Sequence, residues 1–197
     1  MTVNAMKVGL TGGIGCGKST VLRLCEERGA LVVESDAIVR ELLASDRKVI
    51  AEVVESFGEE VLDGEGKIDR GRLGGIVAID SDKLLRLESI LHPIVRRVWT
   101  QKVAEQDSLA VVEIPLLFEK NLQELFDQTV CVASSPKVQM ERLRARGLSD
   151  SQIQWRQQRQ MPLLRKMEMA DVVLMNNGTL QHLNEQLDIL FEQWGAQ

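Results

Sequence analysis

The eight residues GGIGCGKS, at positions 12–19, decide the fold of this chain because they satisfy the phosphate-loop pattern G-x-x-x-x-G-K-[S/T]. An apolar segment at residues 7–11 precedes them and predicts a buried strand. Apolar residues at helical spacing follow them and predict a helix. The motif requires a strand before the loop and a helix after it, and both are predicted here. A glycine turn formed only for steric reasons would not need this order. A dinucleotide-binding loop is disfavoured because it would place glycine where Lys18 stands.

The loop predicts binding of a nucleoside triphosphate, with ATP and Mg²⁺ as the expected nucleotide and metal. Its glycines let main-chain N–H groups surround phosphates, and the start of the following helix adds partial positive charge. Lys18 is predicted to reach the transferring phosphate and Ser19 to ligate Mg²⁺. The predicted nucleotide-binding residues of the loop are Gly13, Ile14, Gly15, Cys16, Gly17, Lys18, Ser19 and Thr20.

Outward from the loop, short apolar runs alternate with segments of helical periodicity. Further strands are predicted at residues 30–33, 109–114, 129–133 and 172–175. The last segment, residues 180–194, carries apolar side chains at spacings of three and four, which predicts an amphipathic helix. The pattern indicates an α/β protein with a three-layer P-loop kinase fold, built on a five-stranded parallel sheet with helices on both faces.

Two additions to this single domain, residues 1–197, are predicted. Roughly 75 residues separate the second and third strands, too many for a simple crossover. Residues 37–108 are therefore expected to form a mostly helical acceptor-binding insertion. Helix-start signals at Ser135-Pro136 and Ser149-Gln152 predict two helices separated by a turn at Gly147, and residues 137–168 are expected to form a small helical lid.

Composition limits the class of protein. Apolar residues make up 44% of the 197 residues and charged residues 27%, and no run approaches the roughly 20 apolar residues of a membrane span. The net charge of −5 argues against a nucleic-acid surface. The three cysteines lack zinc-ligand spacing and are expected to be structural thiols. Without a secretory signal in the first residues, the protein is expected in the cytoplasm, as a monomer or small homo-oligomer.

Two carboxylates end the second predicted strand, in the segment Glu34-Ser35-Asp36. Open α/β sheets bind their ligands at the carboxyl ends of the strands, where the phosphate loop also lies. Asp36 can accept the proton of an acceptor hydroxyl or hold a magnesium-bound water. The alternative is that Asp36 only caps a helix beginning at Ala37.

Further motifs occur in an order and spacing that match one family. They are Leu91-His92-Pro93, Ile114-Pro115-Leu116-Leu117-Phe118-Glu119, the arginine-rich stretch 141–146, Arg156, Gln160, Ala170-Asp171 and Asn176-Asn177-Gly178. With the phosphate loop and the acidic pair, they resemble the dephospho-CoA kinases over nearly the whole chain. The family usually has Asp-Ala-Asp at the acidic pair, so Glu34 is a departure and Asp36 keeps the second acid.

The resemblance implies transfer of the γ-phosphate of ATP to the 3′-hydroxyl of dephospho-CoA, giving coenzyme A and ADP in the last step of coenzyme A biosynthesis. It implies Asp36, Lys18, Arg142 and Arg146 as catalytic residues and adds Arg142 and Asn177 to the nucleotide site. It implies that dephospho-CoA is bound by Asp36, His92, Arg96, Leu117, Glu119 and Arg156.

Each of these assignments has a plainer alternative. His92 can be a loop or helix-start residue, and Glu119 an exposed helix cap. The arginines can belong to a solvated helix face, and Asn177 to a simple turn. Another small-molecule or nucleoside-monophosphate-type kinase remains the rival function. A GTP-dependent switch is disfavoured because Asn-Lys-x-Asp does not occur in the chain.

Overall fold

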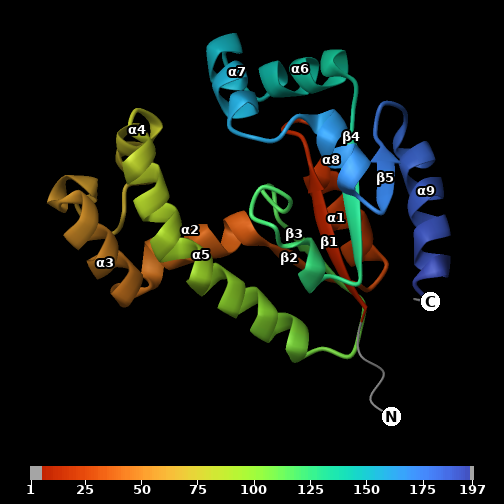
Figure 1. Cartoon of the computed structure of the whole chain (residues 1–197), viewed down its shortest axis with the longest axis horizontal. Helices are drawn as coiled ribbons and strands as arrows, with labels where there is room; N and C mark the ends of the chain where they lie inside the picture. The colour runs from red at the N-terminus through yellow and green to blue at the C-terminus, as the bar shows by residue number, and fades with distance from the viewer. Residues whose placement is uncertain (1–5, 196–197) are drawn as a thin grey trace. The chain divides into compact units, whose positions relative to one another are not determined.

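The computed structural model describes residues 6–195, and the five predicted strands are all present. The first five residues, from which the lack of a secretory signal was argued, lie outside the described range. The strands form one parallel sheet in the order β2-β3-β1-β4-β5 (Figure 1). Their bounds are β1 Lys7–Gly12, β2 Leu31–Glu34, β3 Ala110–Glu113, β4 Gln128–Ala133 and β5 Val172–Met175. The predicted α/β fold with a five-stranded parallel sheet is confirmed.

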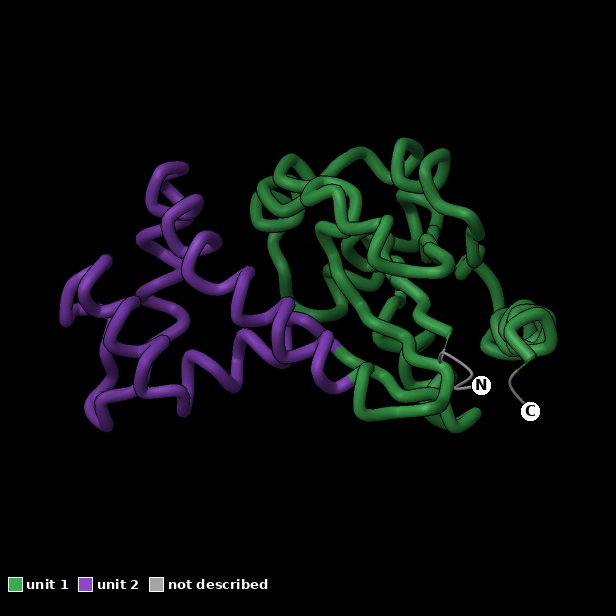
Figure 2. The backbone as a smooth tube through the Cα atoms, turned by 60° about the horizontal axis from the view of Figure 1, so that its bottom comes forward, with its two compact units in different colours: residues 1–33, 103–197 green, residues 34–102 purple. Residues whose placement is uncertain are grey.

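The chain divides into two compact units, shown in different colours in Figure 2. Unit 1 contains the described residues up to Val33 and from Val103 onward, and unit 2 contains Glu34–Lys102. Unit 1 holds the phosphate loop and the sheet. Unit 2 is built from helices. No helix within residues 6–195 combines the length and the apolar character needed to cross a membrane.

Two helices cover one face of the sheet in unit 1. Helix α1, Lys18–Glu27, contacts β1 and β3, and helix α9, Leu180–Gln193, contacts β5 and α1. Alternate residues of the strands, such as Val8 and Leu10 of β1, point into the core shared with these helices. The apolar stripe of α9 is buried there, as its periodicity predicts.

The opposite face of the sheet packs against helix α8, Leu163–Met169, which contacts β1 and β4, and against the segment that follows β3. Gly9 points to this face, since strand residues alternate between faces. A Cβ atom on Gly9 would lie 2.7 Å from Cδ1 of Leu117 and 2.8 Å from Cδ2 of Phe126, so a larger residue would have to displace these side chains. Together the two faces give the three layers of the predicted fold. The 3₁₀ turn η2, Gln123–Leu125, leads from this loop into β4.

The predicted helix starts after β4 are confirmed. Helix α6, Pro136–Ala145, is capped by Ser135, whose hydroxyl accepts from the N–H of Val138 at 3.4 Å. Helix α7, Asp150–Gln158, begins with a full capping box between Ser149 and Gln152. Gly147 between them has φ of 81°, a conformation that glycine adopts without strain.

Unit 2 has its own apolar core. It contains helices α2 Ser35–Ser45, α3 Arg47–Phe57 and α4 Arg70–Ala78, the 3₁₀ turn η1 Glu59–Val61, and helix α5 Ser81–Ala104 except for its last two residues, which belong to unit 1. Val49, Val53 and Val61 are almost completely buried within it. A turn interrupts the helices at Asp63, whose carboxylate accepts from the N–H groups of Glu65 and Lys67.

Helix α5 rules out the alternative in which His92, next to Pro93, is a loop or helix-start residue. The helix runs unbroken through both residues. Pro93 removes the hydrogen bond to the carbonyl of Ser89, but Ser89 is exposed, so water can satisfy that group. Leu91, Val95, Trp99 and Val103 lie one turn apart and are all buried. This continuous apolar face outweighs the cost of an interior proline, which is about 3 kcal/mol.

Candidate active site

The phosphate loop joins β1 to α1 and is shaped by two glycines in left-handed conformations. Gly15 has φ of 78° and Gly17 has φ of 92°. The loop is closed by a hydrogen bond of 3.2 Å from the N–H of Cys16 to the carbonyl of Gly13. In the described part of the chain, the N–H groups of Gly15, Gly17, Lys18 and Ser19 have no hydrogen-bond acceptor. Such unsatisfied donors at a helix start are suited to an anion.

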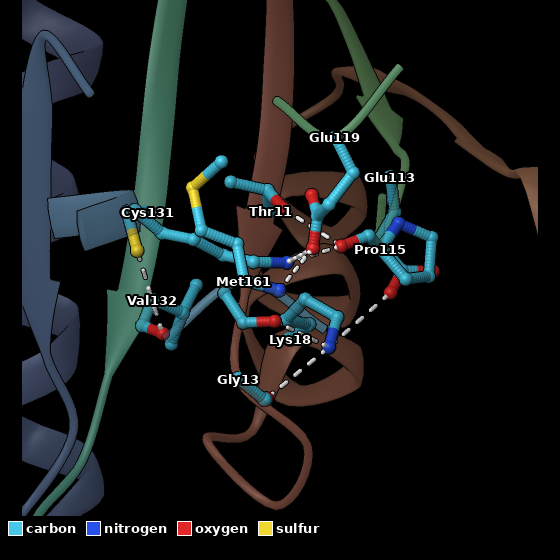
Figure 3. A network of polar contacts seen from close by, with 11 residues as sticks. Thr11, Gly13, Lys18, Glu113, Pro115, Glu119, Cys131, Val132 and Met161 are labelled. Carbon is cyan, nitrogen blue, oxygen red and sulfur yellow. Dashed lines mark hydrogen bonds and ion pairs between the residues drawn. The ribbon is translucent and has the colours of Figure 1, made fainter. Parts of the chain in front are cut away.

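The ammonium of Lys18 folds back over this loop in the structure. Its Nζ donates to the carbonyls of Gly12 at 3.2 Å and Gly13 at 3.3 Å and lies 3.7 Å from Oε1 of Glu113 (Figure 3). The side chains of Lys18 and Glu113 are 12% and 11% exposed. Ser19, the next residue, is exposed. The lysine is therefore held by weak, exchangeable partners beside an open helix start.

Glu113 is a site residue that the sequence analysis missed. It is the last residue of β3 and lies opposite Leu10 of β1 in the strand register. The signal was present, because Glu113 is the one charged residue in the apolar run 109–114. A buried carboxylate requires a partner, and the carboxyl end of a parallel strand is a ligand-binding position.

Beneath the loop, Arg142 of α6 links three segments of unit 1. Its Nη1 donates to the carbonyl of Cys16 at 3.3 Å and to Oγ of Ser134 at 3.1 Å, and its Nη2 donates to Oδ1 of Asn176 at 3.3 Å. The side chain is part-buried, so it is no solvated helix face. A planar guanidinium can serve such divergent acceptors at once.

Asn176, and not its neighbour Asn177, contacts the loop. Its Nδ2 donates to the carbonyl of Cys16 at 2.8 Å, and the residue is 7% exposed. Asn177 is exposed, and its Oδ1 accepts from the N–H of Ser135 at 2.6 Å. Strand alternation could have separated the two, because Asn176 lies two residues after the buried Leu174 and so shares its face.

These residues border a cavity of about 430 Å³ in unit 1. Arg142 of α6 and Arg146, directly after α6, line one side of it, and Asn176 and Leu180 line it on the side of β5 and α9. The remaining lining residues are Gly17, Thr20, Ala145 and Gly178. The volume lies within the range of small-molecule sites, about 300–1,000 Å³, and the walls combine apolar surface with a few polar groups. The structure thus brings the two predicted arginines to one cavity beside the loop.

Glu119 and Leu117, both predicted to bind the acceptor, have internal partners. The Oε1 atom of Glu119 accepts from the N–H of Met161 at 2.8 Å and lies 2.9 Å from Nζ of Lys166 (Figure 3). An exposed helix cap is therefore the wrong alternative for Glu119. Leu117 is 0% exposed, so this structure gives a substrate no access to it.

Arg156, also predicted for the acceptor, is exposed on α7. The guanidinium of Arg159 on the same helix end lies 3.7 Å from the ring centre of Trp155, which is 42% exposed. Stacking of this kind holds a guanidinium in place at the surface.

Four candidates belong to unit 2. Asp36 is exposed and lies within α2, which begins at Ser35, so the alternative in which Asp36 caps a helix starting at Ala37 is wrong. Glu34 pairs with Arg40 at 3.6 Å. His92 and Arg96 are both exposed on α5, and their spacing of four places them on one helix face.

The three cysteines are free and buried, as expected for structural thiols. Cys16 is a loop residue, and burial raises the pKa of its thiol. Burial likewise raises the pKa of Cys25 and Cys131, each to about 12. These thiols are therefore protonated at neutral pH.

Comparisons with known proteins place this arrangement in a family. Residues 6–182 match the family described as dephospho-CoA kinase (CoaE). A dephospho-CoA kinase from Bacillus cereus is 38% identical over 192 residues, covering 95% of this chain and 96% of the relative. The crystal structure of TT1252 from Thermus thermophilus is 34% identical with a TM-score of 0.85, covering 96% of this chain and 98% of that one.

A dephospho-CoA kinase from Campylobacter jejuni shares the fold, with a TM-score of 0.70 at 24% identity over 95% of this chain and 96% of that one. The sequence motifs and the parallel sheet agree with these matches. The chain belongs to the dephospho-CoA kinase family.

Proposed function

We propose that this chain transfers the γ-phosphoryl group of ATP to the 3′-hydroxyl of dephospho-CoA, giving coenzyme A and ADP. The observation that carries the proposal is the phosphate loop, whose Lys18 lies between exchangeable loop carbonyls and the buried Glu113. Relatives that are named dephospho-CoA kinase over nearly the full chain length support the choice of acceptor.

The residues present fit a magnesium ion held together with a triphosphate. Residues 6–195 contain no group of three or more His, Cys, Asp or Glu side chains that could hold a metal by themselves. Mg²⁺ in phosphoryl-transfer sites uses few protein ligands besides phosphates and water. Ser19, with an exposed hydroxyl at the start of α1, and the carboxylate of Glu113 would hold it. When bound, the ion neutralises charge on the phosphate oxygens.

In the proposed reaction, Lys18 exchanges the carbonyls of Gly12 and Gly13 for phosphate oxygens. This exchange costs little free energy. The hydrogen bond from the lysine ammonium to an anionic phosphate oxygen is stronger than the one to a neutral carbonyl. The acceptor oxygen forms a bond to the γ-phosphorus as the bond to the β,γ-bridging oxygen breaks. The proton of the acceptor hydroxyl passes to Asp36, whose exposed carboxylate is free of a capping role.

The cavity lined by Arg142, Arg146 and Asn176 is proposed to take the nucleoside end of ATP. Arg142 and Arg146 would also stabilise charge on the phosphates as residues 137–168 act as a lid. Asn177 was predicted for this role, and its side chain already accepts from Ser135, which favours Asn176 as the side chain that meets the nucleotide.

Dephospho-CoA is proposed to be bound by residues 37–108 together with Arg156, and by the loop that carries Leu117 and Glu119. In the helical insertion, His92 and Arg96 share an exposed face suited to an anionic nucleotide. We place the protein in the cytoplasm, as a monomer or small homo-oligomer, with no nucleic-acid or membrane partner.

An acceptor panel tests this function. Purified protein is incubated with ATP, Mg²⁺ and, separately, dephospho-CoA, AMP, adenosine, shikimate or gluconate, and ADP release is measured. Turnover with dephospho-CoA alone is expected. Turnover only with another member of the panel would replace the proposal with the rival small-molecule kinase.

A further inference from the structure

Lys166 on α8 is a buried lysine that lies outside the phosphate loop. Its side chain is 0% exposed. Its Nζ donates to the carbonyl of Pro115 at 2.6 Å and lies 2.9 Å from Oε1 of Glu119. Burial lowers the pKa of Lys166, and its hydrogen bond with Glu119 opposes that shift. A buried cation is costly, so its contacts identify what the fold gains from it.

The carbonyl of Pro115 joins three segments of unit 1. It accepts from Oγ1 of Thr11, at 3.2 Å, as well as from Lys166 (Figure 3). Thr11 lies in β1 immediately before the phosphate loop. Pro115 lies two residues after Glu113, whose carboxylate faces Lys18. A shift of this carbonyl would therefore move both the start of the loop and the carboxylate beside its lysine.

Glu119 extends the same network toward α7. Its Oε1 also accepts from the N–H of Met161, which lies between α7 and α8. Its Oε2 is buried and has no hydrogen-bond partner within the described chain. Met161 and Lys166 both lie within residues 137–168, the proposed lid, so their contacts with Glu119 hold the C-terminal part of that segment against the loop after β3.

Stability alone does not account for such a pair. Replacing a buried ion pair by apolar residues of similar volume is often neutral or stabilising, whereas removing one partner is strongly destabilising. Lys166 instead joins the segments that bear Lys18, Glu113 and the lid.

We propose that Lys166 is a positioning residue: by holding the Pro115 carbonyl and the Glu119 carboxylate, it sets the geometry of Glu113 and Lys18 for the phosphoryl transfer proposed above. It does so without contacting the nucleotide. The inference rests on that proposed function for its kinetic effect. Its structural part is that Lys166 restrains residues 114–122, and this does not depend on which acceptor the protein uses.

The test compares Lys166→Met with the double variant Lys166→Met/Glu119→Gln. The single variant leaves a buried carboxylate without its cation and is expected to melt earlier. The double variant removes both charges and is expected to regain most of the melting temperature. Arg165→Gln is the matched control, because it breaks an ion pair to Glu168 on the same helix whose side chains are 63% and 62% exposed.

The double variant is expected to keep a kcat about 10- to 100-fold below wild type, the range that a misplacement of about 1 Å can cause. KM for ATP should change less than about threefold in the same variant, since the lost interaction is one of geometry in the transition state. Recovery of kcat together with stability would overturn the proposal. Arg165→Gln should match wild type in both measurements.

A second readout does not depend on the reaction. Amide hydrogen exchange at residues 114–122 should be faster in the double variant, and unchanged exchange there would also overturn the proposal. If the double variant does not fold, Thr11→Val removes the other donor to Pro115 without a change of charge, and an unaltered kcat in that variant would refute the positioning role. Wild-type protein inactive toward dephospho-CoA would count against the proposed function, while the exchange measurement still decides the inference.

Discussion

The two units hold their candidate functional residues in different ways. In unit 1, Lys18, Glu113, Arg142 and Asn176 are buried or part-buried and contact one another or the phosphate loop. In unit 2, His92, Arg96 and Asp36 are exposed on helices. Unit 1 is thus preorganised before any ligand binds, whereas the candidates of unit 2 present their side chains on the solvent-exposed surface of helices.

The difference has an energetic consequence. Preorganised groups lower the barrier because they do not reorganise during the reaction. Exposed side chains on a helix gain order only when they bind, so they contribute mainly to affinity. Changes in unit 1 should therefore lower kcat, and changes in unit 2 should raise KM for the acceptor. The following predictions test this rule, from the largest expected effect to the smallest.

Asp36→Asn is the substitution that should break the rule, because Asp36 belongs to unit 2 but is proposed as the base. We expect kcat to fall by about 10²- to 10⁴-fold, the usual loss of general-base help, with ATP affinity little changed. The melting temperature should fall only slightly, since Asp36 is a first-turn residue of α2 and loses a favourable charge there.

The measurement is turnover at saturating dephospho-CoA, with ATP affinity and melting temperature on the same preparation. Glu34→Gln serves as the comparison at the neighbouring acid. Turnover of Asp36→Asn within about threefold of wild type, far short of general-base losses, would transfer the role to Glu34.

Lys18→Ala tests the preorganised side directly. Loss of the cation is expected to lower kcat by about 10²- to 10³-fold, as other preorganised electrostatic contacts do. The fold should persist, although Glu113 loses its neighbouring cation. Steady-state kinetics and circular dichroism check both points, with Lys7→Ala at the other end of β1 as the control. Nearly full turnover in a folded Lys18→Ala protein would contradict the assigned role of the loop.

Arg142 and Arg146 sharpen the comparison within unit 1, because both line the cavity but only Arg142 is tied to the loop. Hydrogen bonds to charged groups contribute about 1.5–3 kcal/mol, so Arg142→Ala should weaken ATP binding by about 10- to 100-fold and lower turnover as well. Arg146→Ala should have a smaller effect of the same kind. Removing both should barely move the melting temperature beyond the effect of Arg142→Ala.

Calorimetric titration with ATP and thermal melts separate the outcomes. A double variant that unfolds early but keeps its specific activity would make the arginines structural and remove the support for a lid at residues 137–168.

His92→Ala and Arg96→Ala should give the smallest effect. We expect KM for dephospho-CoA to rise by about 2- to 10-fold with kcat unchanged, because exposed hydrogen bonds contribute about 0.5–1.5 kcal/mol of uniform binding. Arg97→Ala is the control, since Arg97 is exposed on α5 but turned by about 100° from Arg96. Initial rates over a range of dephospho-CoA concentrations give KM for each variant. An equal rise in KM for all three variants would mean that the three residues contribute only general surface charge.

The sheet and the phosphate loop could be predicted because their signals are local. The five strands lie within one residue of the predicted bounds, since short apolar runs between turns specify buried parallel strands. The start of α7 was predictable from Ser149 and Gln152, whose reciprocal hydrogen bonds depend only on adjacent residues.

Features that depend on distant packing were not predictable in the same way. Pro93 signals a helix end locally, and the buried face of α5 overrides it. Lys166 has the sequence context of a surface residue, and its burial results from Pro115 and Glu119, about 50 positions earlier. The burial of Glu113 and Asn176 could have been predicted from the sequence. Each is a polar residue at the carboxyl end of a buried strand.

The buried thiols also make the protein convenient for fluorescence work. With the pKa of Cys25 and Cys131 near 12 and all three cysteines shielded, maleimide reagents at neutral pH find almost no thiolate to attack. A cysteine placed at Ile79 of unit 2, which is 90% exposed, and another at Ile189 of unit 1, which is 56% exposed, would be the reactive sites. Donor and acceptor dyes at this pair would report the separation of the two units as ATP and dephospho-CoA are added, without removing any native residue from the core.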